Sequence, residues 1–482
     1  MKKQGIKKNF IYQFLYKLIV LVIPLVLSPY LTRTLGDTAL GTFTFVNSIA
    51  YYFLIFAMLG ISRYGQRLIS ASSKEEIGKN FYSLLTLHAI VSLISIVLYF
   101  AFVFFAPLDD KIIYYIEGLY VASALFDVTW LFYGLENFKN VVIRDLIVKI
   151  VECILIFVFV KSASDLWIYT LITAGGLLIG NAVIIPAAIR NIKYQHFSWN
   201  DCIKHIRPLF LLFIPVVAVS LYTVFDKTIL GIMSTKENVA YYAYAEKLVN
   251  IPKTILNIIG IVIFPRACKL VSDGNDDALQ PLFKKAVFIE FLMGSAFVFG
   301  IISIAQPLAI IYYGESFSAT GPIIAVLSPL ILIIGFGELL RSIFVLPLKK
   351  DKYYVLIYSI SAAINVIVSV VLTLFFDVYG VVIGTLLAEI VGFICQFVIC
   401  RKHINVVVIL KEALPFVGIG VLMFLSIKLF DSFLEISLQN LIIEIFIGAT
   451  VYLLLAGLYV FVFKKEYFIL AKQILMNKIK KQ

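Results

Sequence analysis

Long apolar stretches alternate with short polar gaps along the whole chain. Each stretch has about 20 mostly apolar residues, the length an α-helix needs to cross the hydrocarbon core of a bilayer. Helices are expected because backbone polar groups in lipid must form hydrogen bonds within their own segment. Fourteen such stretches occur, near residues 11–32, 42–61, 81–106, 112–134, 142–161, 166–189, 208–233, 239–264, 286–310, 322–346, 354–376, 378–400, 413–430 and 440–463.

The gaps between these stretches differ in their content of Lys and Arg. Thirty basic residues lie in the two termini and every second gap, whereas the remaining gaps hold only Arg33, Lys111, Lys161 and Lys236. Basic residues concentrate on the cytoplasmic side of membrane proteins. The alternation therefore predicts fourteen transmembrane helices with both termini in the cytoplasm.

The composition agrees with a polytopic membrane protein. Hydrophobic residues make up 61% of the 482 residues, charged residues only 15%, and the mean hydropathy is +0.99. A soluble protein of this size could not bury so much apolar surface. The net charge of +12 follows from the basic gaps, so we expect no nucleic-acid partner. Five scattered cysteines suggest neither a disulfide framework nor a metal site.

A weak internal repeat suggests two six-helix halves. Ile-Pro occurs in both the first and the seventh stretch, at Pro24 and Pro215, and Gly180 aligns with Gly392 at an offset of 212 residues. Transporters are often built from such repeats. The predicted parts are an N-terminal bundle 1–190, a C-terminal bundle 208–400, an appended helix pair 413–463 and a basic, amphipathic tail 464–482.

Motifs for catalysis or nucleotide binding are absent from the sequence. It contains no GxxxxGK[ST] loop, HExxH, CxxC or GxSxG. We therefore predict that the chain is not an enzyme and uses no cofactor, metal or ATP. The GxxxG pairs Gly176–Gly180 and Gly380–Gly384 are typical of close helix packing.

Charged residues inside the apolar stretches carry the most functional information. Each is costly at the centre of a bilayer, so it should face protein or water. Helical spacing places several on shared polar faces, such as Asp145, Lys149 and Glu152. One interpretation is a set of neutralised structural pairs, for example Glu338 with Arg341 and Asp226 with Lys227. The other, which we favour for the set as a whole, is a hydrated cavity between the two halves.

In the cavity interpretation the basic residues hold an anionic head group such as pyrophosphate, and the acidic residues tune them or carry a coupling proton. The candidate binding residues are Lys227, Lys247, Lys253 and Arg341. The acidic candidates are Asp226, Glu246 and Glu338. Pro24 and Pro215 would let their helices bend, because each removes a backbone hydrogen bond.

Three segments resemble a known family. They are SPYLTRTLGDTALGTFTFVNSIAYYFLIFAMLGISRYGQRLIS (Ser28–Ser70), DVTWLFYGLENFKNVVIRD (Asp127–Asp145), and FDKTILG (Phe225–Gly231) followed by YYAYAEKLVNIP and FPRACKL. In this order they resemble the Wzx-type polysaccharide flippases of the multidrug/oligosaccharidyl-lipid/polysaccharide (MOP) exporter superfamily. The matching segments contain Asp226, Lys227, Glu246 and Lys247, and they add Arg33 to the binding candidates and Asp127 to the acidic ones.

The resemblance implies a fold of two six-helix bundles plus two helices, like that of multidrug (MATE) transporters. It implies that undecaprenyl-pyrophosphate-linked oligosaccharide repeat units are flipped to the outer leaflet, by alternating access without ATP, for capsule or O-antigen-type polysaccharide. Its expected partners are membrane lipids and the polymerase and assembly proteins of that pathway. Two alternatives stay open: a cation-coupled multidrug antiporter on the same scaffold, and a flippase for lipid-linked peptidoglycan precursors.

Overall fold

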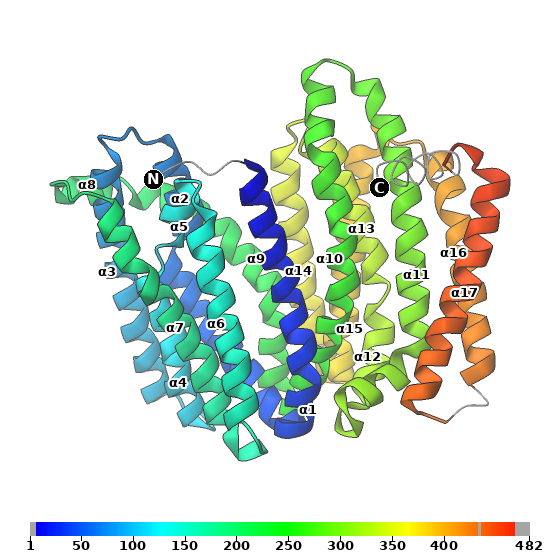
Figure 1. Cartoon of the computed structure of the whole chain (residues 1–482), viewed down its shortest axis with the longest axis horizontal. Coiled ribbons are helices and arrows are strands. Elements are labelled where there is room, and N and C mark those ends of the chain that lie inside the picture. Colours follow the sequence, from blue (N-terminus) through cyan, green and yellow to red (C-terminus); the bar gives the residue numbers. More distant parts are fainter. Residues whose placement is uncertain (1–5, 432–434, 468–482) are drawn as a thin grey trace, which may run out of the picture. The chain divides into compact units, whose positions relative to one another are not determined.

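The computed structural model describes residues 6–431 and 435–467, and within them every regular element is a helix. The described chain forms two compact units, drawn in Figure 1. Unit 1 comprises Met1–Ala240 and Thr373–Val378, and unit 2 comprises Tyr241–Leu372 and Tyr379–Gln482. The side chains of residues 6–21, 191, 215, 218, 219, 221 and 222 lie outside the described part.

Eleven helices of the described residues are long and apolar enough to cross a membrane. The chain is therefore an all-α, polytopic membrane protein, as its sequence predicts, while the count of fourteen stays a prediction. Two predicted spans fall within the single long helix α1. Two more, at 142–161 and 208–233, are helical as α6 and α9 but are not among the eleven.

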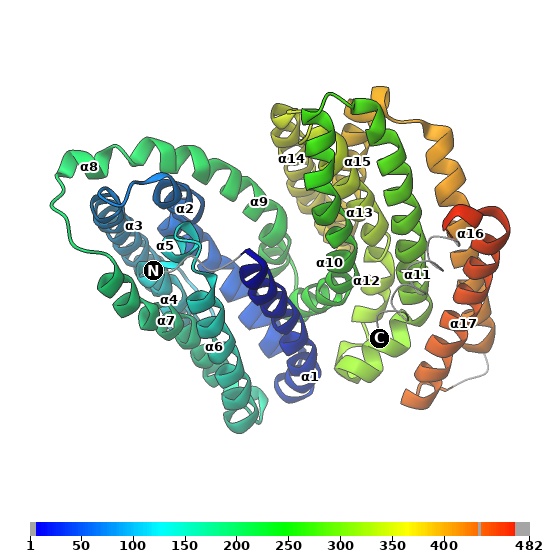
Figure 2. The same ribbon diagram turned by 45° about the horizontal axis from the view of Figure 1, so that its top comes forward.

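Unit 1 is built around its first helix, which packs against α3, α4, α6 and α9. The long helices of this unit stand side by side in both views (Figure 1, Figure 2). Its elements are α1 (Ile6–Met58), α2 (Ile61–Ala71), α3 (Ile77–Phe105), α4 (Lys111–Ala122), η1 (Ser123–Phe126), α5 (Thr129–Gly134), α6 (Phe138–Phe159), η2 (Ala163–Asp165), α7 (Leu166–Asn191), α8 (Trp199–Ile203) and α9 (Ile206–Met233).

Helix α1 contains two helices that meet at one residue. Gly36 has φ 78° and ψ 178°, a backbone conformation that favours glycine, and it turns the chain between the two predicted spans. The predicted gap from 33 to 41 is thus almost entirely helical. Pro24 lies within the first part of α1, whereas the side chain of Pro215 in α9 lies outside the described residues.

The predicted helix 112–134 is broken in the structure. Helix α4 ends at Ala122, a short 3₁₀ turn follows, and α5 begins at Thr129. The break arises at Asp127, whose Oδ1 accepts hydrogen bonds from the backbone N–H of Thr129 at 2.8 Å and from its hydroxyl at 2.6 Å. A carboxylate that accepts these bonds starts a new helix, because it satisfies groups that the first turn leaves without partners.

Short helices fill two of the basic gaps. Helix α2 follows a turn at Leu59 and Gly60, both with positive φ, and buries Ile61, Tyr64 and Ile69 on one side. Helix α8 lies near the start of α3, where Lys79 forms a 3.0 Å ion pair with Asp201. These two basic gaps therefore meet at the same end of unit 1.

Unit 2 is centred on α11, which packs against α12, α13, α16 and α17. The predicted appended helices are α16 and α17. They pack against α11 through aromatic contacts such as that between Phe288 of α11 and Phe416 of α16. Its elements are α10 (Lys236–Ser272), which begins in unit 1, η3 (Asp276–Ala278), α11 (Leu279–Tyr313), η4 (Glu315–Phe317), α12 (Thr320–Leu327), α13 (Leu330–Leu340), η5 (Arg341–Val345), α14 (Asp351–Phe376), α15 (Val378–Cys400), η6 (Arg401–His403), α16 (Val406–Asp431) and α17 (Leu438–Phe463).

The predicted span 322–346 is also interrupted. It starts anew at Pro329, the residue before α13, and ends in one π turn from Arg341 to Val345. The division by packing differs from the predicted one, because α9 groups with unit 1 through its contacts with α1 and α2. Of the predicted tail 464–482, residues 468–482 lie outside the described part.

Candidate functional site

A cluster of charged side chains in unit 1 begins on α6. Residues 145, 149 and 152 share one face of this helix because they are three and four positions apart. Lys149 Nζ lies 2.7 Å from Glu152 Oε2, and Arg144 Nε lies 2.8 Å from Asp145 Oδ1. Both basic residues are therefore paired with a carboxylate on their own helix.

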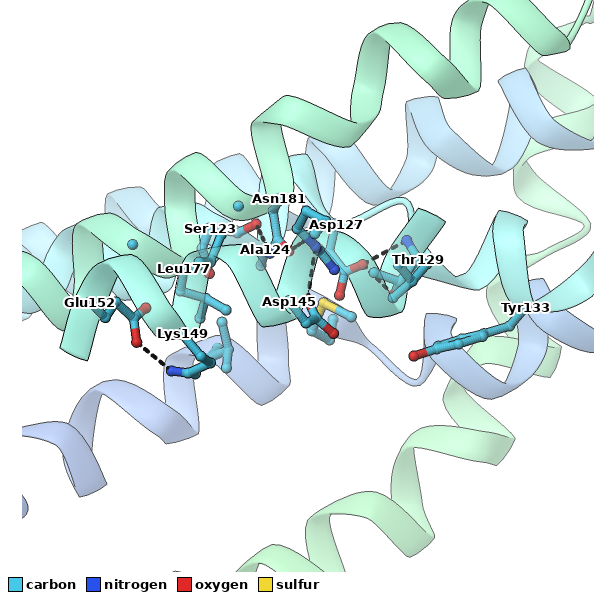
Figure 3. Close-up of a pocket in the computed structure, with 17 residues that line it drawn as sticks. Ser123, Ala124, Asp127, Thr129, Tyr133, Asp145, Lys149, Glu152, Leu177 and Asn181 are labelled. Atoms are coloured by element: carbon cyan, nitrogen blue, oxygen red, sulfur yellow. Dashed lines mark hydrogen bonds and ion pairs between the residues drawn. The ribbon is translucent and has the colours of Figure 1, made fainter. Parts of the chain in front are cut away.

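Side chains from α7 and the break at Asp127 complete the cluster. Arg144 Nη1 donates to Asn181 Oδ1 at 2.7 Å, and Asn181 Nδ2 donates to the carbonyl oxygen of Ser123 at 3.0 Å. Figure 3 shows Asp127, Asp145 and Asn181 close together, with Tyr133 on the α5 side. The amide of Asn181 thus links α6 to the 3₁₀ turn that precedes Asp127.

Glycines on α7 make room for this cluster. A Cβ atom on Gly176 would lie 2.3 Å from Glu152 Oε1, and one on Gly180 would lie 3.1 Å from Val148. The GxxxG pair predicted from the sequence therefore permits close packing, here against a carboxylate as well as an apolar side chain. Glu152 is only 6% exposed, and its Oε1 has no hydrogen-bond partner among the described residues.

These residues line a cavity of about 340 Å³. Leu54 and Met58 of α1 form its apolar wall, opposite Asp127, Arg144 and Lys149. A second, largely apolar groove between α6 and α7 shares four lining residues with it: Arg144, Val148, Glu152 and Gly176. Unit 1 thus presents polar and apolar space side by side, which suits a ligand with a polar and an apolar part.

Unit 2 contains a second polar cluster, around Glu338 and Arg341. Arg341 donates to Glu338 Oε2 through Nη2 at 2.8 Å and Nε at 3.1 Å, and Ser342 Oγ donates to Glu338 Oε1 at 2.7 Å. The guanidinium also lies over the ring of Tyr358, 5.6 Å from its centroid, and 3.5 Å from Gln396 Oε1. Arg341 is only 9% exposed, so this part of the prediction matches the structural-pair interpretation.

The remaining candidates occupy separate positions on α1, α9 and α10. Arg33 is exposed and donates to the carbonyl oxygen of Pro29 at 3.2 Å. Asp226 is 3% exposed and Lys227, next to it, is half-buried. On α10, Glu246 and Lys253 are half-buried, and the exposed Lys247 lies over the Tyr244 ring at 4.5 Å.

Three buried polar residues of the two units are not apparent from the sequence pattern. Arg144 lies beside a basic gap, and Asn181 is a single amide on an apolar helix. Glu290, in the first half of α11, is fully buried in unit 2. The sequence contains one indication of Glu290: it is a single Glu within an otherwise uncharged apolar run. A charged side chain has a high free-energy cost in a membrane.

A hydroxyl–histidine cluster lies at the end of unit 1 that carries α2 and α8. His205 Nδ1 is 2.7 Å from Tyr64 Oη, and its Nε2 is 3.0 Å from Ser83 Oγ. Burial lowers the pKa of His205 to about 4. Nearby, the backbone N–H of Ser198 and the ammonium groups of Lys79 and Lys204 hold the pKa of Asp201 below its usual range.

Metal-ligand geometry is absent from the described residues: they contain no group of three or more His, Cys, Asp or Glu side chains placed to hold a metal ion. The two clusters therefore offer hydrogen bonds and charge. They can bind a polar ligand, and a carboxyl group in them can exchange a proton.

Comparison with known proteins gives one family and two curated relatives. The family model described as "Polysaccharide biosynthesis protein" matches residues 6–271. A protein of Shigella dysenteriae named for O-antigen transport is 27% identical over 396 residues, which cover 80% of this chain and 97% of that one. A protein of Escherichia coli K12 with the same name is 24% identical over 344 residues, covering 70% and 82%.

Solved structures share the fold. The lipid II flippase MurJ in an inward closed conformation matches with a TM-score of 0.74 and 18% identity, over 94% of this chain and 98% of that one. An inward-facing multidrug resistance transporter of the MATE family, in the MOP superfamily, matches with a TM-score of 0.56 and 14% identity, over 81% and 95%. At these identities the likeness concerns the fold.

Proposed function

Because this chain belongs to the polysaccharide biosynthesis protein family, we propose that it is a flippase for undecaprenyl-pyrophosphate-linked oligosaccharide repeat units. The family match over residues 6–271 is the observation that carries this proposal. It agrees with the resemblance to Wzx-type flippases found in the sequence. The relatives are transporters and flippases, which confirms the prediction that the chain is not an enzyme.

The unit 1 cluster supports a ligand that is part sugar and part lipid. Asp127, Asp145 and Asn181 supply acceptors and an amide, the groups that bind sugar hydroxyls. The apolar groove between α6 and α7 adjoins the same cavity. A lipid-linked oligosaccharide needs both kinds of surface, whereas a small hydrophilic solute needs only the first.

We assign the anionic head group to the basic candidates Arg33, Lys227, Lys247 and Lys253, whereas Arg341, enclosed and paired with Glu338, is assigned a structural role. An ammonium or guanidinium group binds a pyrophosphate by charge-assisted hydrogen bonds, and the polyprenyl tail stays in lipid. The carboxylates Asp127, Asp226, Glu246 and Glu338 tune these cations or carry a coupling proton.

Movement of the two halves by alternating access, without ATP, completes the proposal. Pro24 and Pro215 serve as hinges because each removes one backbone hydrogen bond from its helix. The chain works in the cytoplasmic membrane of a bacterium with both termini inside, among membrane lipids. Its product feeds capsule or O-antigen-type polysaccharide, with a polymerase and assembly proteins as partners and without nucleic acid.

The test is complementation of a bacterial strain that lacks its own repeat-unit flippase. Wild-type protein should restore surface glycan, and Lys227→Gln, Lys247→Gln and Lys253→Gln, made one at a time, should each lower it at unchanged membrane abundance. Lys74→Gln, an exposed lysine before α3, is the matched control and should export normally. Normal export by all three test variants would contradict the assignment of the cations.

Two further measurements separate the alternative functions. A multidrug antiporter on this scaffold would protect cells from cationic drugs and leave surface glycan unchanged. A flippase for peptidoglycan precursors would be essential for growth and would replace an endogenous one in a depletion strain. The proposed function predicts neither result.

A further inference from the structure

Glu290 is the most deeply enclosed carboxyl group of unit 2. It lies in the first half of α11, the central helix of this unit, with an exposed fraction of 0%. Neither Oε1 nor Oε2 has a hydrogen-bond partner among the described residues. Buried polar atoms in proteins are nearly always paired, so a carboxyl group with two unpaired oxygens calls for an explanation.

The site around Glu290 is shaped to accept a carboxyl group. A Cβ atom on Gly335 of α13 would lie 1.9 Å from Glu290 Oε1, so only a glycine leaves room for it. Leu256 of α10 lies against the same glycine, and Phe291 and Phe336 pack together beside it. The side chain therefore occupies a close-fitting, apolar pocket between α11 and α13.

Several charged and titratable groups on the surrounding helices have other partners, while Glu444 of α17 has a buried Oε2 without one among the described residues. Glu338 of α13 repels a charge on Glu290, and Arg341 and Ser342 hold its own oxygens. On α16, Glu412 is bound by Lys464 at 2.5 Å, and on α17 the hydroxyl of Tyr452 donates to the carbonyl oxygen of Leu292. Helix α12, TGPIIAVL, carries no titratable residue.

An ionised carboxylate in this pocket would have no donor and a like charge nearby. Burying such a charge is far more costly than burying the neutral acid. The described residues contain no group of three or more His, Cys, Asp or Glu side chains that could hold a metal ion as counter-charge. The proton is thus the ligand that fits the pocket.

We propose that the carboxyl group of Glu290 is a reversible proton-binding site of unit 2. In the conformation described here the site is occupied, as Glu290–COOH. Release gives Glu290–COO⁻ and a proton that water accepts, and the carboxylate then needs donors that the pocket lacks. Proton release therefore requires α11 and α13 to repack, which links the charge state of Glu290 to the conformation of the unit.

The direct test is a pH titration of the purified full-length protein in lipid nanodiscs, followed by infrared difference spectroscopy. Wild type should show a titrating carboxylic-acid C=O band that Glu290→Gln removes. Glu444→Gln, which changes another buried glutamate of unit 2, should keep that band. Wild-type and Glu290→Gln spectra that match at every pH would overturn the proposal, and this holds even if other variants fold poorly.

A cellular test asks whether the proton is used, and this part rests on the proposed function. Glu290→Gln mimics the neutral acid, so it should fold and reach the membrane but reduce surface glycan to the level of the flippase-deficient strain. Glu290→Asp keeps a titratable group and should restore part of the export. Normal export by Glu290→Gln would show a permanently neutral structural acid and overturn reversibility. A titrating band in a protein whose wild type exports no glycan would instead count against the proposed function alone.

Discussion

The polar clusters of the two units contain similar side chains in different surroundings. In unit 1 Lys149 lines a cavity with a side chain that is 45% exposed, whereas the side chain of Arg144 beside it is only 10% exposed. In unit 2 the side chain of Arg341 is 11% exposed and is held by Glu338 within its own helical turn. Each unit also places a buried glutamate against a glycine of a neighbouring helix: Glu152 on Gly176, and Glu290 on Gly335.

This difference separates two uses of charge in a membrane protein. A cation at a cavity wall keeps access to water or ligand, so its partner can be exchanged at small cost. An enclosed ion pair has no substitute partner, and losing one member leaves an uncompensated charge. We therefore expect the cavity of unit 1 to exchange its partners readily, and the enclosed groups of unit 2 to respond through a proton-dependent change of packing.

Removal of the enclosed cation, Arg341, should have the largest effect on the free energy of unfolding. Arg341→Met leaves Glu338 without its strongest donors, and we expect a loss of about 3–5 kcal/mol in the free energy of unfolding. Thermal unfolding of the purified protein, followed by size-exclusion chromatography after heating, measures the loss. A stability equal to wild type would show that the pair is dispensable and would remove the contrast between the units.

Replacing Gly335 of unit 2 by a larger residue should have the next largest effect on the free energy of unfolding. Gly335→Ala brings a methyl group to 1.9 Å from Glu290 Oε1, and overpacking of this kind costs about 1–3 kcal/mol. Gly175→Ala on α7 is the control, because no atom lies within 4 Å of its Cβ position and alanine favours a helix. The same unfolding measurement should show a loss for the first variant and none for the second.

Low pH should lower the stability of unit 1 because His205 becomes protonated. The folded state holds this imidazole neutral, with a pKa of about 4, whereas the unfolded chain has a pKa of about 6.5. The unfolded state therefore binds more protons between these values, and the stabilisation, fully present above pH 6.5, is lost as pH falls toward 4. We expect a loss of about 2 kcal/mol over this range, absent in His205→Gln. An unchanged pH slope in that variant would contradict the assignment.

The smallest effect is expected at the cavity wall of unit 1. Lys149→Met removes a half-exposed partner of Glu152, and such pairs contribute about 0–1 kcal/mol. Its unfolding temperature should therefore stay close to that of wild type, in contrast to Arg341→Met. A loss as large as that of Arg341→Met would show that the cavity is as tightly closed as the centre of unit 2.

The fold was more predictable from the sequence than the clusters were. The bilayer imposes the same requirements on every transmembrane helix: a minimum apolar length, and Lys and Arg on one side. Most spans therefore lie where the apolar stretches of the sequence predict them. The break at Asp127 escaped prediction because an acidic residue in an apolar run looks the same whether it faces water or starts a helix. Helix α2 escaped because an amphipathic helix of 11 residues resembles a polar gap.

The clusters depend on which helices adjoin, which one sequence does not reveal. The face of α6 with Asp145, Lys149 and Glu152 was visible from spacing alone. Its meeting with Asn181 and Asp127 needed the packing of α6, α7 and α5. Glu290 has no charged neighbour three or four residues away, so helical spacing does not place it on a polar face.

The π turn at Arg341–Val345 determines what the deletion of one residue would do to this part of the chain. A π turn holds one residue more than an α turn, so deleting one residue there would let ordinary helical bonding continue. The parts of the helix on either side would then keep their places, because the deletion removes only the extra residue that the π turn accommodates. The chain could thus lose one residue at this point without changing which neighbour Arg341 faces.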